Sequence, residues 1–164
     1  MARLKALLFF LLVPGTIFVY LPLALGCLDF ANPNPLPLLR ILALPAWLLG
    51  LGSTGWCIWA FLRLGNGTPA PNEPPTELVA GGPYRFTRNP MYQAGLLILL
   101  GYALWFQSWL QWLYLLILVI FFQVVVTFEE RELQRRYGAA YLRYCEITPR
   151  WGLRLRKSQK KVKY

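Results

Sequence analysis

Three long stretches of the chain carry no charged side chain, and they constrain the fold more than any other feature. Lys5 and Asp29 flank 23 uncharged residues, and Arg40 and Arg63 flank 22 more. A third stretch, 89–128, has 40 residues without a charge. A helix that crosses a membrane needs about 20 apolar residues at a rise of about 1.5 Å per residue. The first two stretches are therefore each long enough for one such helix, and the third is long enough for two.

We predict an all-α integral membrane protein with about four transmembrane helices. The predicted helices cover residues 6–28, 37–62, 91–106 and 109–128. Ala46, Gly50 and Thr54 recur at a spacing of four in the second helix, and such small residues let helices pack closely. Composition agrees with a membrane protein, because 57% of the 164 residues are hydrophobic and 15% are charged, against about 45–50% and about 25% in soluble domains. We expect residues 1–164 to form a single membrane domain.

The basic residues lie mostly on one side of the predicted helices. If both termini are cytoplasmic, 16 of the 17 lysines and arginines fall in cytoplasmic segments, as the positive-inside rule describes for multi-pass proteins. This asymmetry explains the net charge of +10 without a nucleic-acid partner. The basic tail, 150–164, is expected to lie near anionic membrane lipid.

A further amphipathic helix is predicted after the fourth span. One leucine and three tyrosines recur at spacings of 4, 4 and 3 between Leu133 and Tyr144, which places them on one face of a helix. We expect this helix to lie along the cytoplasmic interface and to end at Thr148 and Pro149.

The sequence lacks several residues on which enzymes often depend. It contains no histidine, which excludes Ser-His triads, histidine bases and histidine-ligated metals. The three cysteines, Cys27, Cys57 and Cys145, are far apart, so their spacing indicates neither a disulfide framework nor a metal site. We therefore expect no metal cofactor.

Two polar segments fall on the same predicted face of the membrane. The first is 82–92, with the sequence GPYRFTRNPMY, and the second is the pair Glu129 and Glu130. Arginines and an asparagine at a helix start suit an anion, tyrosines offer π faces to a purine or a cation, and carboxylates accept hydrogen bonds from an ammonium or ribose hydroxyls. Together these groups suit a zwitterionic, nucleotide-like cofactor. The structural alternative is that the glutamates only pair with the arginines at 131–136.

The sequence resembles the isoprenylcysteine carboxyl methyltransferases and the related phospholipid N-methyltransferases in the motifs GPYRFTRNPMY, EE and YGAAYLRY. The resemblance covers about residues 68–151. It implies an S-adenosylmethionine-dependent methyltransferase that acts at the cytosolic face on a lipophilic acceptor, either a prenylcysteine-like carboxyl group or a phospholipid amine. The residues that it implies for cofactor binding are Thr76, Glu77, Leu78, Val79, Tyr84, Asn89, Pro90, Met91, Tyr92, Glu129 and Glu130.

Two positions depart from the pattern of the prenylcysteine enzymes. Asn89 stands where the family often has histidine, and the Asn-Pro-Met-Tyr form is more similar to the phospholipid enzymes. Val125 stands where the prenylcysteine enzymes have an arginine, which argues against a prenylcysteine substrate. If the acceptor is an amine, a base is needed, and Glu129, Glu130 or a neighbouring tyrosine could serve. Two other functions stay open: an NADPH-dependent membrane reductase of the sterol-reductase-like type, and a non-enzymatic membrane scaffold.

Overall fold

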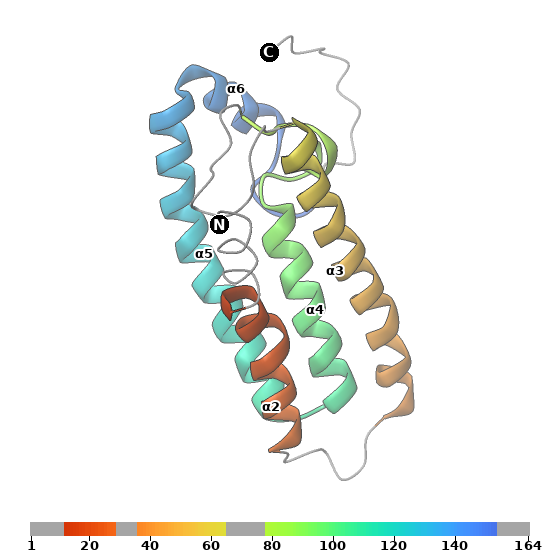
Figure 1. Cartoon of the computed structure of the whole chain (residues 1–164). Helices are drawn as coiled ribbons and strands as arrows, with labels where there is room; N and C mark the ends of the chain where they lie inside the picture. The colour runs from red at the N-terminus through yellow and green to blue at the C-terminus, as the bar shows by residue number, and fades with distance from the viewer. Residues whose placement is uncertain (1–11, 29–35, 65–77, 154–164) are drawn as a thin grey trace.

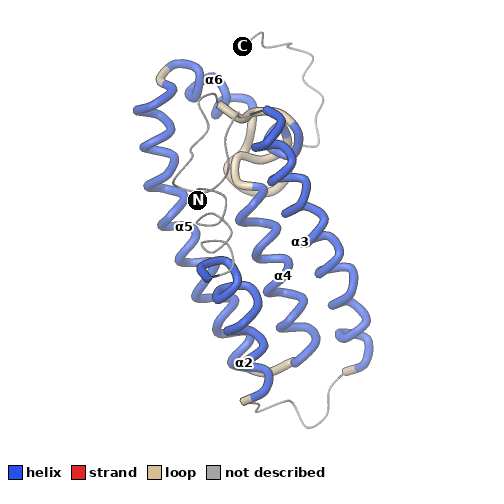
Figure 2. The backbone as a smooth tube through the Cα atoms, in the orientation of Figure 1, coloured by secondary structure: helices blue, strands red, loops and turns tan. Residues whose placement is uncertain are grey.

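The computed structural model of the chain describes residues 12–28, 36–64 and 78–153, and these residues form helices and short turns (Figures 1 and 2). No strand occurs among them, so the all-helical prediction is confirmed for this part of the chain. The elements are the π-helix η1 (Thr16–Tyr20), α2 (Leu21–Cys27), α3 (Pro37–Leu64), the 3-10 helix η2 (Gly82–Arg85), α4 (Pro90–Phe106), α5 (Trp109–Tyr137) and α6 (Ala139–Ile147).

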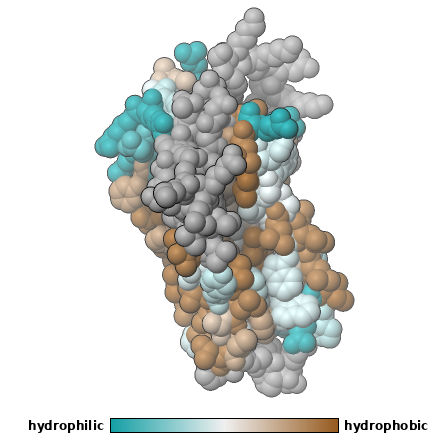
Figure 3. Space-filling view, viewed as in Figure 1, coloured by the Kyte–Doolittle hydropathy of each residue, from teal (hydrophilic) through white to brown (hydrophobic). Residues whose placement is uncertain are grey.

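Two helices of the bundle, α3 and α5, are long and apolar enough to cross a membrane. The stretch Leu12–Cys27 and helix α4 are apolar but shorter. Large apolar side chains cover much of the lower bundle surface, while hydrophilic side chains gather near the upper end (Figure 3). Two of these exposed apolar side chains are Leu48 of α3 and Phe128 of α5, whose exposed fractions are 72% and 63%. The stretch Leu12–Cys27 and helices α3, α4 and α5 correspond to the four predicted spans. The number of helices that cross the membrane stays a prediction.

Small residues bring α3 and α4 into close contact. Ala43, Ala46 and Gly50 are buried on one face of α3, at spacings of three and four that suit a helical stripe. A Cβ atom on Gly50 would lie 2.9 Å from the carbonyl oxygen of Ala94 in α4. The helices therefore meet backbone against backbone at this level, as the predicted stripe of small residues indicated.

Aromatic rings from two neighbouring helices lie on glycines of α4. A Cβ atom on Gly95 would be 2.5 Å from the Phe18 ring of η1, and one on Gly101 would be 2.4 Å from the Trp47 ring of α3. The Trp47 indole also donates a hydrogen bond to the carbonyl of Ile98, at 3.1 Å. Each ring occupies the space that a Cβ atom would need, so only a glycine fits there. Helix α4 therefore has to be rotated so that Gly95 faces Phe18 and Gly101 faces Trp47.

The end of α5 differs from the prediction. The helix predicted to stop at residue 128 continues to Tyr137, so Leu133 and Tyr137 lie inside α5 and not in a separate amphipathic helix. The break falls at Gly138, whose φ of +52° is open to glycine but strained for other residues. The physical reason is that charged residues mark where a chain leaves an apolar environment, whereas an α-helix continues until a residue interrupts it.

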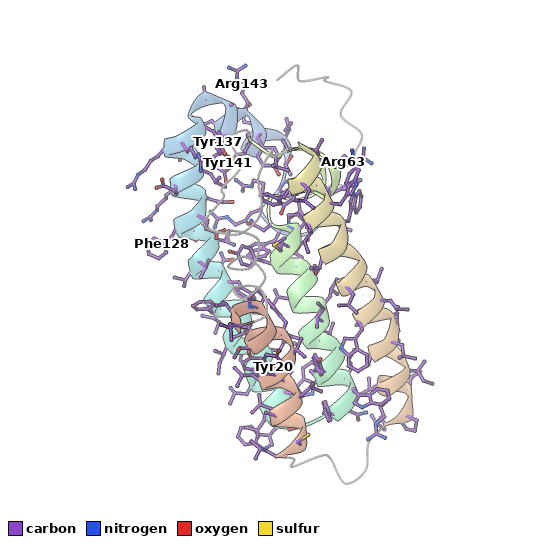
Figure 4. The ribbon with its side chains drawn as sticks, viewed as in Figure 1. Tyr20, Arg63, Phe128, Tyr137, Tyr141 and Arg143 are labelled. Atoms are coloured by element: carbon purple, nitrogen blue, oxygen red, sulfur yellow. The ribbon has the colours of Figure 1, made fainter. Side chains whose placement is uncertain are left out.

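Helix α6 follows the break and folds over the upper end of the bundle (Figure 1). Its tyrosines Tyr141 and Tyr144 are buried, while Arg143 is exposed and points away from the bundle (Figure 4). Tyr141 and Tyr144 pack with Ala80 and with the partly buried Leu78. The helix therefore covers the segment that leads into η2. Its position along a membrane interface stays a prediction.

Candidate functional site

Most of the predicted site residues that the structure describes lie at the upper end of the bundle. There η2, the start of α4, the last turns of α5 and α6 come together (Figure 1). A sharp loop, 86–89, joins η2 to α4. Because Pro90 occupies the first position of α4, where its missing N–H leaves no helical bond unmade, the sequence fixes where this helix starts.

Tyr92 and Glu129 are in direct contact across α4 and α5. The Tyr92 hydroxyl donates a hydrogen bond to Glu129 Oε1, at 2.6 Å. The Tyr92 ring packs against Phe122, with the ring centroids 4.9 Å apart. Phe122 precedes Glu129 by two helical turns on the same face of α5. Two predicted cofactor residues that are far apart in sequence are therefore neighbours in the structure.

Glu130 lies between two arginines that come from different parts of the chain. Arg88 Nη1 is 3.3 Å from Glu130 Oε1, and Arg150 Nη2 is 2.5 Å from Glu130 Oε2. Consecutive residues of a helix point about 100° apart, so Glu129 and Glu130 have different neighbours. The Glu130 side chain is only 11% exposed, and the cluster of Arg88, Glu130 and Arg150 has one positive charge in excess.

The electrostatic setting keeps the Arg88 guanidinium charged. Burial acts to lower the pKa of Arg88, but the charge of Glu130 and the contact with Cys145 raise this pKa above its ordinary value. Arg88 Nη1 donates to Cys145 Sγ at 2.7 Å. Burial raises the pKa of the nearby Tyr141 hydroxyl, so this tyrosine stays neutral.

A small cavity of about 190 Å³ opens beside this cluster. Its lining residues come from the η2–α4 loop, α5, α6 and the residues after α6. They are Arg88, Thr127, Glu130, Arg131, Gln134, Tyr141, Leu142, Cys145 and Arg150. Arg88 Nε, Glu130 Oε1 and the Tyr141 hydroxyl are buried and make no hydrogen bond within the described residues. Glu130 Oε1 is occupied by the ion pair with Arg88 Nη1, so the two donors, Arg88 Nε and the Tyr141 hydroxyl, are available to a polar ligand or to water.

Three predicted site residues form part of an apolar cluster instead of lining the cavity. Val79 and Tyr84 are buried together, and Met91 packs against them. The Tyr84 ring meets Phe61 of α3 edge to face, with centroids 5.4 Å apart, and its carbonyl oxygen accepts a hydrogen bond from Tyr144 at 2.6 Å. Burial raises the pKa of the Tyr84 hydroxyl. In the structure these residues hold η2 against α3 and α6, and their contact with a cofactor stays a prediction.

The Asn89 side chain makes a hydrogen bond inside the protein. Its Nδ2 donates to the carbonyl oxygen of Arg150 at 3.1 Å, and its side chain makes no capping bond to α4. Leu78 packs against α6. Thr76 and Glu77 lie outside the described residues.

Sequence reasoning missed the two arginines that bind Glu130. Arg88 lies within the 82–92 motif but is not among the residues that the resemblance implies for cofactor binding, and the sequence places Arg150 in the basic tail. For Arg150 the available signal was its position in the sequence. It directly follows Thr148 and Pro149, which end the predicted helix, so it has to lie close to the end of that helix. The expected pairing of glutamates with 131–136 is right only for Glu132, which is 3.5 Å from Arg135 on an exposed face.

The described residues contain no group of three or more side chains that could hold a metal ion. Comparison with protein families gives one match: a family model described as phospholipid methyltransferase covers residues 38–140. This stretch starts at α3 and ends just inside α6, so it includes Tyr92, Glu129 and Glu130 but not Arg150. Neither the curated proteins nor the solved structures contain a match to the chain.

Proposed function

The chain belongs to the phospholipid methyltransferase family, whose model covers more than half of it, and on this premise we propose that it is an integral membrane, S-adenosylmethionine-dependent methyltransferase. We further propose that it acts on a lipophilic acceptor at the cytosolic face. One observation carries the proposal: adjacent glutamates of α5 occupy two different polar settings at one end of an apolar helix bundle, Glu129 at Tyr92 and Glu130 between two arginines.

The side chains at this end fit the chemistry of the cofactor. S-adenosylmethionine carries an ammonium, a carboxylate, ribose hydroxyls and an adenine ring. Glu129 can accept hydrogen bonds from the ammonium or the hydroxyls, and Arg88 supplies positive charge for the carboxylate. The unpaired Arg88 Nε and Tyr141 hydroxyl are further donors. When bound, the cofactor supplies an activated methyl group.

The size of the cavity limits which part of the cofactor these residues hold. Ligand pockets commonly measure about 300–1,000 Å³, and the cavity measures about 190 Å³. We propose that the described residues hold the charged end of the cofactor. Thr76 and Glu77, with the neighbouring Leu78, Val79 and Tyr84, would complete the site, as the family resemblance implies.

The acceptor that we favour is a phospholipid amine. The side chains one turn before the two glutamates are Val125 and Val126, so α5 offers no cation there for a substrate carboxylate. An amine has to lose a proton to act as a nucleophile. Glu130 is already bound by two arginines, whereas Glu129 is bound to a neutral tyrosine. We therefore propose Glu129 as the group that takes this proton.

Calorimetric titration of the detergent-purified chain with S-adenosylhomocysteine, with NADPH in parallel, tests the function. We expect micromolar-range binding of S-adenosylhomocysteine and no binding of NADPH. Binding of NADPH alone would favour the membrane reductase. Binding of neither ligand by a folded, monodisperse sample would favour the scaffold.

Two substitutions test the site itself. Glu129→Gln keeps the size of the side chain but removes its charge, and Tyr92→Phe removes the hydroxyl that donates to it. A hydrogen bond to a charged group contributes about 1.5–3 kcal/mol, so we expect Glu129→Gln to bind S-adenosylhomocysteine at least about tenfold more weakly. Tyr92→Phe removes a contact within the protein and not one with the ligand, so its loss of affinity should be smaller. Glu132→Gln is the matched control, because Glu132 lies on the same helix with its side chain 70% exposed. Equal affinities for Glu129→Gln and the control would contradict the assignment.

A further inference from the structure

The residues that follow α6 return across the start of α4, and we call this segment, 148–152, the C-terminal strap. Its backbone is held by the η2–α4 loop. The Arg88 N–H donates to the carbonyl of Pro149 at 2.9 Å. Thr87 Oγ1 and Asn89 Nδ2 both donate to the carbonyl oxygen of Arg150, at 3.1 Å each. Three consecutive residues of the loop therefore bind the strap through its main chain.

The strap also reaches the sides of α4 and α5. Trp151 Nε1 donates to Gln123 Oε1 of α5 at 2.6 Å, and Gln93 Nε2 of α4 donates to the carbonyl of Gly152 at 3.4 Å. The Trp151 ring packs against the apolar cluster around Phe122. Contacts on both sides of Arg150 thus restrain the backbone from which its side chain extends.

The Arg150 side chain makes a different contact from its backbone. Its guanidinium binds Glu130 Oε2, and Arg88 lies at the other carboxylate oxygen. A carboxylate on a helix can adopt several rotamers. Two cations, one at each oxygen, hold it in one of them. Site groups held in position before a ligand arrives lose less freedom on binding.

We infer that Arg150 is a positioning residue, which acts through Glu130 to set the affinity of the site for a zwitterionic cofactor. The inference rests on the proposed function. It gives the strap a role in the site, although Arg150 belongs by sequence to the basic tail. Because the strap is tied down by the carbonyl of Arg150, replacing the side chain removes the contact with Glu130 and leaves the main-chain hydrogen bonds possible.

The test compares R150M with R143M in the full-length, detergent-purified chain. Both changes remove one arginine charge from the same end of the molecule, but Arg143 is exposed and points away from the bundle (Figure 4). We expect R150M to bind S-adenosylhomocysteine at least about tenfold more weakly than the unchanged chain, as when one partner of a partly buried charge pair is removed. R143M should bind as the unchanged chain does. Thermal unfolding of each variant, measured without ligand, accompanies the titrations.

A double-substitution cycle separates positioning from a purely structural role. If Arg150 acts through Glu130, R150M should have little further effect on affinity in an E130Q background. Equal, additive losses in both backgrounds would overturn the inference, as would unchanged affinity in R150M. If R150M does not fold, R150K takes its place: it keeps the charge but not the guanidinium fork, so we expect weaker binding, and unchanged affinity would overturn the inference.

Binding by the unchanged chain separates the proposed function from the role of Arg150. If it binds S-adenosylhomocysteine but R150M binds equally well, the proposed function stands and the role of Arg150 is refuted. If it does not bind the ligand, both are refuted.

Discussion

Replacing Gly50 by alanine should weaken the contact between α3 and α4. The added Cβ would lie 2.7 Å from Cγ1 of Ile98, 2.9 Å from the carbonyl oxygen of Ala94 and 3.0 Å from the Ile98 nitrogen. Two of these three atoms belong to the α4 backbone. A side chain could rotate away, but backbone atoms can retreat only if the helices separate. The substitution therefore loses contacts along the whole stripe of small residues.

The magnitude follows from a comparison with Gly52 in the same helix. A Cβ on Gly52 would meet nothing within 4 Å, so Gly52→Ala changes only the helix propensity, which favours alanine by about 0.8–1.0 kcal/mol. Gly50→Ala has the same propensity gain and in addition the overpacking cost of about 1–3 kcal/mol. Propensity cancels in the difference between the two variants, so Gly50→Ala should be less stable than Gly52→Ala by about 2 kcal/mol.

Thermal unfolding in detergent, followed by circular dichroism, measures this difference. For a chain of this size about 2 kcal/mol corresponds to a difference in Tm of about 4–8 °C. Equal Tm values for the two alanine variants would refute the close backbone contact. A higher Tm for Gly50→Ala would refute the packing of α3 on α4 at this level.

Three further predictions concern stability and are checked by the same unfolding assay. The buried Gln111 amide donates a hydrogen bond to the carbonyl of Pro22 at 2.6 Å. Gln111→Leu removes this donor and should lower the free energy of unfolding by about 1–3 kcal/mol; an unchanged Tm would contradict this. Gly138→Ala should cost about 1–3 kcal/mol from backbone strain alone, because φ is +52° and the new Cβ meets nothing within 4 Å; a raised Tm would contradict it. Burial raises the pKa of Tyr84 and Tyr141 in the folded protein. Above about pH 10 the unfolded chain therefore loses protons that the folded chain keeps, and stability should fall as the pH rises. A Tm that stays constant from about pH 9 to about pH 11 would contradict this.

The helices could be predicted from the sequence because apolar length is a local property. The second uncharged stretch predicted 37–62, and the structure has α3 at Pro37–Leu64. The end of α5 could not be placed in this way. The glutamates after residue 128 are good helix formers, so they end an apolar stretch without ending a helix. The helix ends only at Gly138.

The site could be predicted in part. The resemblance implies both Tyr92 and Glu129 as cofactor-binding residues, and the structure places them in contact. The partners of Glu130 were not predictable from spacing, because Arg88 and Arg150 approach it only after α6 has folded over the bundle and the strap has returned. An arginine in a basic tail and an arginine in a binding site cannot be told apart from the sequence. Only the tertiary structure distinguishes them.

The length of α5 has a consequence for the depth of the site. The helix begins at Trp109, a residue type enriched at the boundary between lipid and water. Glu129 follows 20 residues later, which is about 30 Å along the helix axis and matches the thickness of the hydrocarbon core, also about 30 Å. In a bilayer entered at Trp109, the Tyr92–Glu129 contact lies at the level of the opposite headgroups. A phospholipid amine already resides at this level, so under the proposed function the acceptor can react while its acyl chains remain in the bilayer.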